Sequence, residues 1–460
     1  MVTDRHAING KIPAPDERFD VVVVGAGSAG TVAAIDAARG GASVLLIDEN
    51  PVRGDMIGTD VPLYFGGRMT AAVQSPQRMV EQLFATNPLL EEAFDAGVDV
   101  RLGTCAWGLY VNGPAMRTLP EPLLGIADSE SATMIGFGRL LLATGARDVV
   151  LGFEGWTRPG VMGAQGFAML LARYDALASR RILVVGGGEL GRETVRLALD
   201  RGLEVAGIVG FGEIEPVGDV PLFPHHSIAA TEGGIDGVER AVLASLTGDG
   251  RSTIECDTIV LAIAAAPATE LIDAAGVGPG GTIELIGDCA TVPRPDPALL
   301  AAWSAALGRY ASPATIVCQC EEVTRADLIG VQPPHYLDRP APMAARSLAS
   351  LLNDGPAHPD QIKRLTRAGM GACQGRRCRE QVTCLLAAEQ GTTPDRVPVA
   401  SMRVPVRPIP LGILADWNER PEMAAGWDVW FGIPTQWLPY AVIGTPEEAE
   451  LVANGGNMHV

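Results

Sequence analysis

Apolar and polar positions fall into blocks near the start of the chain. An apolar, β-branched run at residues 19–24 leads into a glycine turn at residues 25–30. A helix-like stretch then runs to Arg39, and a second apolar run follows at residues 42–47. Short apolar runs bounded by glycine are typical of buried parallel strands. The block order therefore predicts a strand, a helix and a parallel strand, which together form a βαβ unit.

The same order of blocks returns once. It predicts a strand at residues 182–185, a glycine loop at 186–191, a helix to Arg201 and a strand at 204–209. One further buried strand is expected between these units, at residues 138–145, and two more after them, at 256–263 and 282–288. A helix is expected at residues 297–310. Five prolines lie between residues 394 and 410, so we expect the C-terminal tail to run extended over the surface.

Composition and charge narrow the class of protein. With 460 residues, 47% of them hydrophobic, the chain is long enough for several domains, each with its own core. A net charge of −19 disfavours nucleic acid and anionic membranes as partners. We find no signal peptide and no membrane span, and eight cysteines without secretory signals indicate a reducing compartment. We therefore expect a cytoplasmic protein.

The first glycine loop has the spacing of a nucleotide-binding turn. A loop of this kind lets the backbone approach a pyrophosphate at the N-terminus of the following helix. The acid that holds the adenosine ribose is expected about 20 residues on; Asp48 lies 23 positions after Gly25, and Glu49 is the neighbouring alternative. Close packing alone is the other explanation for such glycines. The candidate residues are Gly25, Gly27, Ser28, Ala29, Gly30, Asp48 and Glu49.

Two later strings favour FAD over NAD as the ligand of this loop. Ala143-Thr144-Gly145 and Gly287-Asp288 resemble the two further FAD-contacting segments of flavoproteins with two dinucleotide-binding domains. That resemblance implies a hydrogen bond from Asp288 to the ribityl or phosphate part of FAD. A helix N-cap or turn is the alternative role for Asp288, and both roles can hold together.

The second glycine loop, Gly186, Gly188 and Gly191, resembles the NAD-binding insert of the same flavoproteins. The expected position of the ribose-binding acid is Val209, followed by glycine and phenylalanine, and Glu213 comes four positions late. Three possibilities stay open: an NAD(P)H site, a site for another nucleotide, and a structural domain without a ligand.

Four of the later cysteines form two close pairs, Cys318 with Cys320 and Cys373 with Cys378. Thiolates on short, glycine-containing turns can present four sulfurs to one centre, as iron–sulfur clusters and structural zinc require. Zinc sites more often use two-residue spacers, so the spacing favours iron. The surrounding sequence resembles the bacterioferritin-associated-ferredoxin-like 2Fe-2S domain, and this resemblance implies that these four cysteines are the cluster ligands.

Nearly the whole chain resembles the large flavoprotein subunit of heteromeric amine and imino-acid dehydrogenases. This family includes the large subunits of opine oxidase, hydrogen cyanide synthase and hydroxyproline dehydrogenase. The resemblance implies a flavin-containing, oxidase-like beta subunit that oxidises the substrate, and leaves room for a small third subunit. The present chain would pass electrons to a downstream acceptor, and no catalytic acid or base is assigned to it.

The expected fold is therefore α/β: a flavoprotein with two Rossmann-like dinucleotide-binding domains, a small C-terminal 2Fe-2S domain and an extended tail. The FAD domain is expected in two segments, residues 1–155 and 257–312, separated by an NAD-like insert at residues 156–256. The 2Fe-2S domain is expected at residues 313–391 and the tail at 392–460. Two alternative functions are a self-sufficient NAD(P)H-dependent reductase that feeds a ferredoxin or oxygenase, and a non-enzymatic iron-transfer or redox-sensing module.

Overall fold

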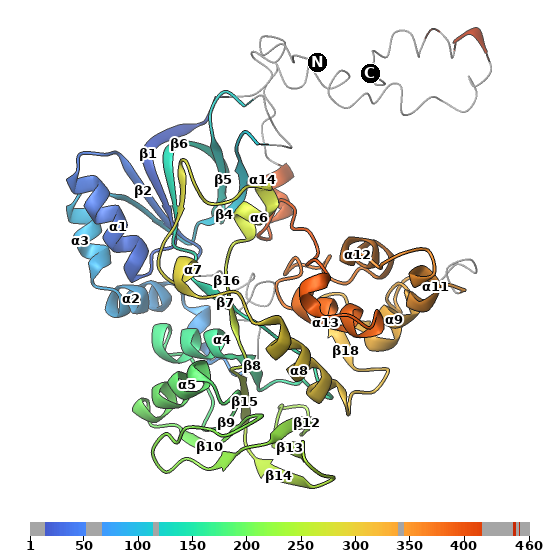
Figure 1. The fold of residues 1–460 in the computed structure, drawn as a ribbon. Helices are drawn as coiled ribbons and strands as arrows, with labels where there is room; N and C mark the ends of the chain where they lie inside the picture. The colour runs from blue at the N-terminus through green and yellow to red at the C-terminus, as the bar shows by residue number, and fades with distance from the viewer. Residues whose placement is uncertain are drawn as a thin grey trace.

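Three units make up the described portion of the chain (Figure 1). The computed structural model describes residues 14–51, 67–113, 119–338 and 345–415, together with 445–447 and 450. The first unit is coloured blue to cyan except for its last part, residues 270–291, which is yellow; the second unit is green, and the third, which carries the four paired cysteines, is orange. No helix in these ranges has the length and apolarity needed to cross a bilayer.

The first unit is built on a seven-stranded sheet with the order β3-β2-β1-β6-β5-β4, and β17 lies beside the end of β6. Its strands are β1 (Glu17–Val24), β2 (Val44–Asp48), β3 (Asp99–Leu102), β4 (Cys105–Tyr110), β5 (Leu123–Ala127), β6 (Ala132–Leu142) and β17 (Ile283–Leu285). Its helices are α1 (Ser28–Arg39), η2 (Ala71–Gln74), α2 (Pro76–Thr86), α3 (Leu89–Asp95), α6 (Glu270–Ala275) and α7 (Asp288–Thr291). The βαβ unit expected at the start of the chain is present, with β1 parallel to both β2 and β6.

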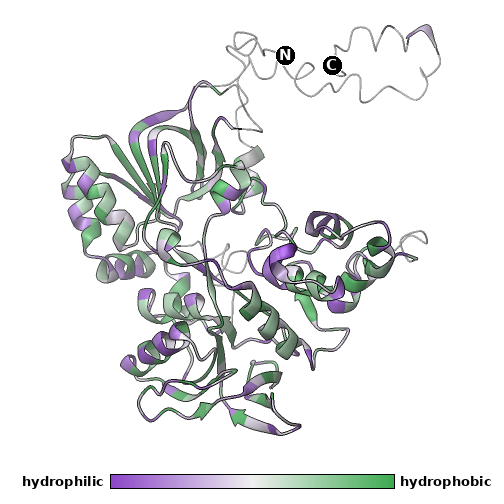
Figure 2. Ribbon diagram, viewed as in Figure 1, coloured by the Kyte–Doolittle hydropathy of each residue, from purple (hydrophilic) through white to green (hydrophobic). Residues whose placement is uncertain are grey.

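Both faces of β1 are covered, which explains its continuous apolar run. Val21 and Val23 belong to one core cluster with Ala34 and Ile35 of α1. The alternate residues, Val22 and Val24, belong to a second cluster with Leu271 and Ile272 of α6. Because side chains alternate across a strand, a strand buried on both faces needs apolar residues at every position. Figure 2 shows the resulting hydrophobic strands and the more hydrophilic outer helices.

The second unit contains a five-stranded parallel sheet with the order β11-β10-β9-β15-β8 and an antiparallel sheet with the order β12-β13-β14. The chain enters and leaves through the paired strands β7 (Ala146–Asp148) and β16 (Ala265–Pro267). The other elements are β8 (Val161–Gly163), α4 (Ala164–Ala168), the π-helix η3 (Met169–Arg173), β9 (Arg181–Val185), α5 (Glu189–Asp200), β10 (Glu204–Val209), β11 (Leu222–Phe223), β12 (His226–Glu232), β13 (Arg240–Ser245), β14 (Arg251–Glu255) and β15 (Thr258–Leu261). The second expected βαβ unit, and with it the two-dinucleotide-domain fold, is confirmed.

The third unit follows α8 (Pro297–Gly308) and has its own core, to which Val317, Leu328, Ile362 and Leu386 belong. Its elements are β18 (Ile316–Cys318), β19 (Val323–Thr324), α9 (Arg325–Gly330), α11 (Leu348–Leu352), α12 (Pro359–Thr366), α13 (Arg379–Glu389) and η4 (Pro394–Arg396). The helix α14 (Leu411–Ala415) belongs to the segment that follows this unit. Every residue from 379 to 387 in α13 is buried, so this helix is enclosed by the rest of the protein.

The tail differs in its first residues from the expected surface segment. Val406 is only 1% exposed and belongs to the second core cluster of the first unit. Its N–H donates a hydrogen bond of 2.8 Å to the carbonyl oxygen of Trp107 in β4. Residues that follow the third unit in sequence therefore return to the first unit and pack against it.

Candidate functional site

A cavity of about 550 Å³ lies where β1, β2 and β6 end. All the residues assigned from the sequence to the first nucleotide site line it: Gly25, Gly27, Ser28, Ala29, Gly30, Asp48, Glu49, Ala143, Thr144, Gly145, Gly287 and Asp288. These residues come from four separate segments of the chain. The fold therefore brings them to one place, outside the carboxyl ends of parallel strands, where dinucleotides bind in folds of this type.

The glycines of the first loop have different physical reasons to lack a side chain. A Cβ atom on Gly25, whose φ is +109°, would lie 2.3 Å from the carbonyl oxygen of Ala143. One on Gly30 would lie 1.9 Å from the carbonyl oxygen of Gly25. A Cβ on Gly27 would meet nothing within 4 Å, because this residue faces the cavity. The first and third glycines thus permit the tight turn, and the second keeps the approach to the backbone open.

Asp48 holds the loop in place. Its carboxylate accepts hydrogen bonds from the N–H of Ala26 at 2.7 Å and from the N–H of Asn50 at 2.8 Å, and Arg173 lies 3.4 Å from it. The Asn50 side-chain amide also donates to Asp48 at 2.8 Å, so these four donors match the about four acceptor positions of a carboxylate. Glu49 accepts a hydrogen bond of 2.5 Å from Arg407 Nε. The two candidate acids are therefore both at the cavity, each with an arginine beside it.

The two later FAD-type segments meet at the far wall. Thr144 Oγ1 donates to the carbonyl oxygen of Ala268 at 2.7 Å and lies 3.2 Å from Cys289 Sγ. Gly287, with φ of +60°, occupies the N-cap position of α7, so Asp288 is the first helical residue and not the cap. Asp288 lines the cavity, and its contact with FAD stays a prediction.

Sequence reasoning missed several charged residues of this cavity. Arg147, Asp148, Arg173, Glu270, Arg376 and Arg407 also line it. Asp148 is 2% exposed and accepts hydrogen bonds from the N–H groups of Gln165 at 2.7 Å and Gly166 at 3.0 Å, at the start of α4. Burial raises the pKa of Asp148 to about 6, although these hydrogen bonds oppose the shift. A signal in the sequence was the Arg-Asp pair that follows the Ala143-Thr144-Gly145 turn after one alanine, in an otherwise apolar region.

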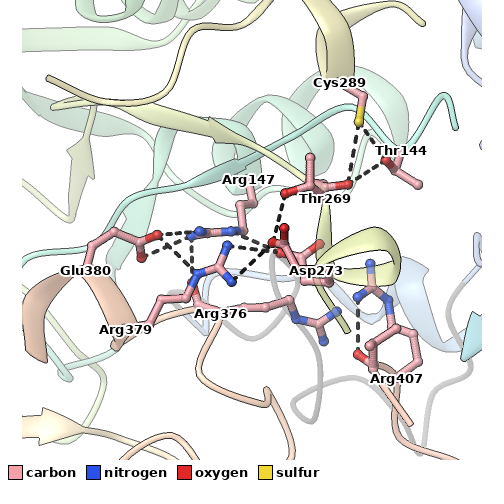
Figure 3. A network of polar contacts seen from close by, with 12 residues as sticks. Thr144, Arg147, Thr269, Asp273, Cys289, Arg376, Arg379, Glu380 and Arg407 are labelled. Atoms are coloured by element: carbon pink, nitrogen blue, oxygen red, sulfur yellow. Dashed lines mark hydrogen bonds and ion pairs between the residues drawn. The ribbon is translucent and has the colours of Figure 1, made fainter. Parts of the chain in front are cut away.

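A buried ion network joins the first unit to α13 (Figure 3). Arg147 Nε lies 3.0 Å from Glu270 of α6, and the same guanidinium pairs with Glu380 of α13. Arg379 Nε lies 3.2 Å from Glu380. Burial alone would raise the pKa of Glu380, but Arg147 and Arg379 bring it below its ordinary value. The network therefore keeps a carboxylate ionised between the nucleotide cavity and the cysteine unit.

The four paired cysteines lie together in the third unit. Cys318 ends β18, Cys320 follows it, and Cys373 and Cys378 bound the loop before α13. The thiols pair across the two segments, Cys378 with Cys318 and Cys320 with Cys373. All but Cys320 are at most 2% exposed. The side chains thus stand as two pairs, and within the described ranges no three His, Cys, Asp or Glu groups form a metal-binding set as they stand.

The surroundings of these thiols suit a negatively charged sulfur centre. The N–H of Gly369 lies 3.4 Å from Cys318 Sγ. A Cβ atom on Gly371 would lie 2.5 Å from Cys320 Cβ, so only glycine fits beside that cysteine. The hydrogen bond from Cys320 lowers the pKa of Cys373 to about 6 against the effect of burial, with help from the backbone N–H and the charge of Arg377. Four soft donors with N–H groups directed at sulfur are what an iron–sulfur cluster needs.

The second glycine loop repeats the backbone geometry of the first. A Cβ on Gly186 would lie 2.1 Å from the carbonyl oxygen of Ala262, one on Gly191 would lie 1.9 Å from that of Gly186, and one on Gly188 would meet nothing within 4 Å. The surroundings differ, however. Glu189 is the first residue of α5, and the Ile214 side chain lies 3.0 Å from the Cβ position of Gly187.

Two family models match successive parts of the chain. The family model described as pyridine nucleotide-disulphide oxidoreductase matches residues 19–296, and that of the sarcosine oxidase A3 domain matches residues 336–417. The A subunit of opine oxidase from Agrobacterium tumefaciens is 24% identical over 86% of this chain and 91% of its own length. The HcnB subunit of hydrogen cyanide synthase from Pseudomonas aeruginosa is 24% identical over 85% of this chain and 97% of its own.

A third relative and a solved structure extend the comparison. The alpha subunit of sarcosine oxidase from Rhizobium meliloti is 26% identical over 86% of this chain and 42% of its own length. The crystal structure of L-proline dehydrogenase from P. horikoshii superposes with a TM-score of 0.54 and 18% identity, and covers 88% of this chain and 81% of that one. At that identity the structural likeness establishes the fold and no more.

The match over residues 19–296 covers more than half of the chain and includes both glycine loops. The resemblance drawn from the sequence to the large subunit of opine oxidase and its relatives is confirmed, as is the assignment of the chain as a flavoprotein oxidoreductase. This chain belongs to the pyridine nucleotide-disulphide oxidoreductase family.

Proposed function

We propose that this chain is the FAD- and 2Fe-2S-carrying electron-transfer subunit of a heteromeric amine or imino-acid dehydrogenase of the opine or hydroxyproline type. It takes electrons from a flavin-containing catalytic beta subunit. One observation carries the proposal: the loop from Cys373 to Cys378 holds two of the four clustered thiols and also contributes Arg376 to the wall of the dinucleotide cavity. Two redox groups bound at these places would be neighbours.

FAD fits the cavity by the residues that surround it. Gly27 and the N-terminus of α1 would face the pyrophosphate, because the open side of the loop and the free N–H groups of the helix lie there. Asp48 or Glu49 would accept from the ribose, and Asp288 would lie at the ribityl or phosphate portion. The bound flavin would supply two-electron acceptance, and an iron–sulfur cluster would transfer electrons singly. The assigned ligands of the 2Fe-2S cluster are Cys318, Cys320, Cys373 and Cys378.

The partner is inferred from the relatives. The opine oxidase and HcnB proteins are named as subunits, which supports a complex of several chains in this case as well. We assign substrate oxidation to an oxidase-like beta subunit, allow a small third subunit, and place a downstream acceptor after the cluster. The domain limits proposed from the sequence, from 1–155 through 392–460, are kept for this assignment.

The alternative of a self-sufficient NAD(P)H-dependent reductase is disfavoured by the second glycine loop. No acid stands at the end of β10, where the ribose hydroxyls would need one. Glu189 places a carboxylate in the first turn of α5, where a phosphate would approach. The FAD-type cavity disfavours an iron-transfer module, which needs no flavin.

Anaerobic stopped-flow spectroscopy tests this function. The chain is produced together with its beta subunit, then mixed in turn with NADH, with NADPH and with candidate amines or imino acids. We expect flavin bleaching in this chain only with an organic substrate and only when the beta subunit is present. Rapid bleaching of the isolated chain by NADH would contradict the proposal and favour the reductase.

A further inference from the structure

The loop between Cys373 and Cys378 carries two adjacent arginines that are both only 3% exposed. Burying two successive guanidinium groups lowers the stability of the fold unless each interacts with a polar or charged group, because charge is strongly disfavoured away from water. The loop is held by turns, with the N–H of Arg376 donating to the carbonyl oxygen of Cys373 at 3.1 Å and that of Cys378 to Gly375 at 3.2 Å. The positions of the two arginines are therefore fixed relative to the cysteines.

Arg376 is directed to the dinucleotide cavity, whose wall it forms. Its carbonyl oxygen accepts a hydrogen bond of 3.0 Å from Arg147 Nη1, which ties the loop to the buried ion network. Figure 3 shows the Arg376 side chain extending away from Glu380 and toward the side on which Arg407 lies. A guanidinium in this place presents positive charge and several donors to whatever fills the cavity.

Arg377 is directed to the cysteines. Its Nη1 donates a hydrogen bond of 2.6 Å to Oε1 of Gln319, which stands between Cys318 and Cys320 in the sequence. Its backbone N–H is hydrogen-bonded to Cys373, and its charge also interacts with that thiol. The charge of Arg377 also interacts with Asp148, which lines the cavity.

We propose that these neighbouring arginines act on different redox groups: Arg376 binds and tunes the dinucleotide in the cavity, and Arg377 tunes the group held by the four cysteines. The inference rests on the proposed function, because it requires both groups. Positive charge stabilises the reduced, more negative form of a nearby redox group. Each arginine therefore raises the reduction potential of its own group, and the loop fixes the distance between the two.

The test uses the full chain with its beta subunit, purified without oxygen, as wild type and as the variants Arg376→Gln and Arg377→Gln. Three quantities are measured: FAD affinity, the flavin reduction potential, and the electron paramagnetic resonance spectrum and potential of the reduced cluster. We expect Arg376→Gln to weaken FAD binding about tenfold or more, as the loss of one charge-assisted contact does. We also expect it to lower the flavin potential and to leave the cluster spectrum unchanged.

Arg377→Gln is expected to give the opposite pattern. Iron and sulfide stay bound, the cluster potential falls, and FAD affinity stays within about twofold of wild type. Arg376→Lys and Arg377→Lys keep the charge and lose the planar fork, so their potentials should lie nearer to wild type than those of the glutamine variants. If a glutamine variant does not fold, the lysine variants test the inference in its place. Arg376→Lys must then weaken FAD binding and leave the cluster spectrum unchanged.

Equal effects of the two substitutions on both groups, or no effect of either, would overturn the inference. Failure of the proposed function would show in a different measurement, the cofactor content of the wild-type chain. A wild-type chain that lacks FAD or the cluster refutes the function and the corresponding arginine role together. A wild-type chain that contains both groups leaves the comparison of variants to decide the inference by itself.

Discussion

Gly27 and Gly30 of the first loop look equivalent in a motif but meet different surroundings. A Cβ on Gly30 would lie 1.9 Å from a backbone oxygen that cannot move aside, whereas one on Gly27 would point into open space at the cavity. Folding thus constrains Gly30, and the proposed ligand would constrain Gly27. The two roles can be separated experimentally because the φ of Gly27 is −75°, a value that alanine adopts without strain.

We predict that Gly27→Ala folds with a loss of about 0.5 kcal/mol or less in the free energy of unfolding but binds FAD at least tenfold more weakly, since the methyl group occupies the approach to the pyrophosphate. Gly30→Ala, the matched control, should lose about 1–3 kcal/mol because of the steric overlap. Urea unfolding and FAD titration measure the two effects. Equal destabilisation by both substitutions would show that Gly27 has only a packing role.

Asp148 provides a pH-dependent contribution to stability. Burial raises its pKa from the ordinary 3.8 to about 6 in the folded chain. Between these values the folded state binds a proton that the unfolded state has lost, so stability falls as pH rises. The contribution is fully present below about pH 4 and is lost above about pH 6. The shift corresponds to about 3 kcal/mol at most.

We therefore predict that the difference in unfolding free energy between wild type and Asp148→Asn changes in one direction between about pH 4 and pH 6. Wild type should lose stability relative to the variant as pH rises, because asparagine does not titrate. Urea unfolding at half-unit pH steps gives this difference and cancels the titration of other groups. A difference that is constant over this range would mean that Asp148 keeps its ordinary pKa.

At the scale of elements, α13 links the nucleotide cavity to the cysteine unit. Its first turn carries Arg379 and Glu380 into the buried network with Arg147 and Glu270, and the cysteine loop ends where the helix begins. A buried pair contributes little net stability, but removal of one partner leaves the other charge unpaired away from water. The network therefore acts mainly to fix the position of α13 against the first unit.

We predict that Glu380→Gln costs about 2–3 kcal/mol in the free energy of unfolding, because Arg147 and Arg379 both lose this carboxylate and keep Glu270 as their shared buried acid. Glu284→Gln serves as the control, since the Glu284–Arg139 pair is exposed and should contribute about 1 kcal/mol or less. Urea unfolding compares the two. A Glu380→Gln variant as stable as the control would show that the network is not the main connection between the units.

The elements also show what a sequence can reveal. The βαβ units at β1 and β9 were predictable because each is local: an apolar run, a glycine turn and a helix lie within about 30 residues. The burial of the first turn of α13 was not predictable. A helix that begins with Arg-Glu-Gln is expected to be exposed to solvent, unless the charges of Arg147 and Glu270 are known to lie opposite it. Val406 was missed for the same reason, as its burial depends on Trp107, far away in the sequence.

At the scale of the whole molecule, the candidate sites also contain some residues that the sequence predicts and some that it does not. The residues expected to contact a cofactor through backbone shape or sulfur were predicted, because glycine spacing and cysteine pairs mark them in the sequence. The arginines that complete the cavity were not, since Arg173, Arg376 and Arg407 come from three different regions of the fold. Their arrangement exists only once the third unit and the tail have packed against the first.

The content of iron, acid-labile sulfide and flavin in the chain purified without oxygen tests the central claim most directly. We predict one FAD, two iron atoms and two sulfide ions per chain, and we expect Cys373→Ser to lose the iron and sulfide while it keeps FAD. A chain that retains FAD but contains neither iron nor sulfide would contradict the claim that one polypeptide holds both redox groups.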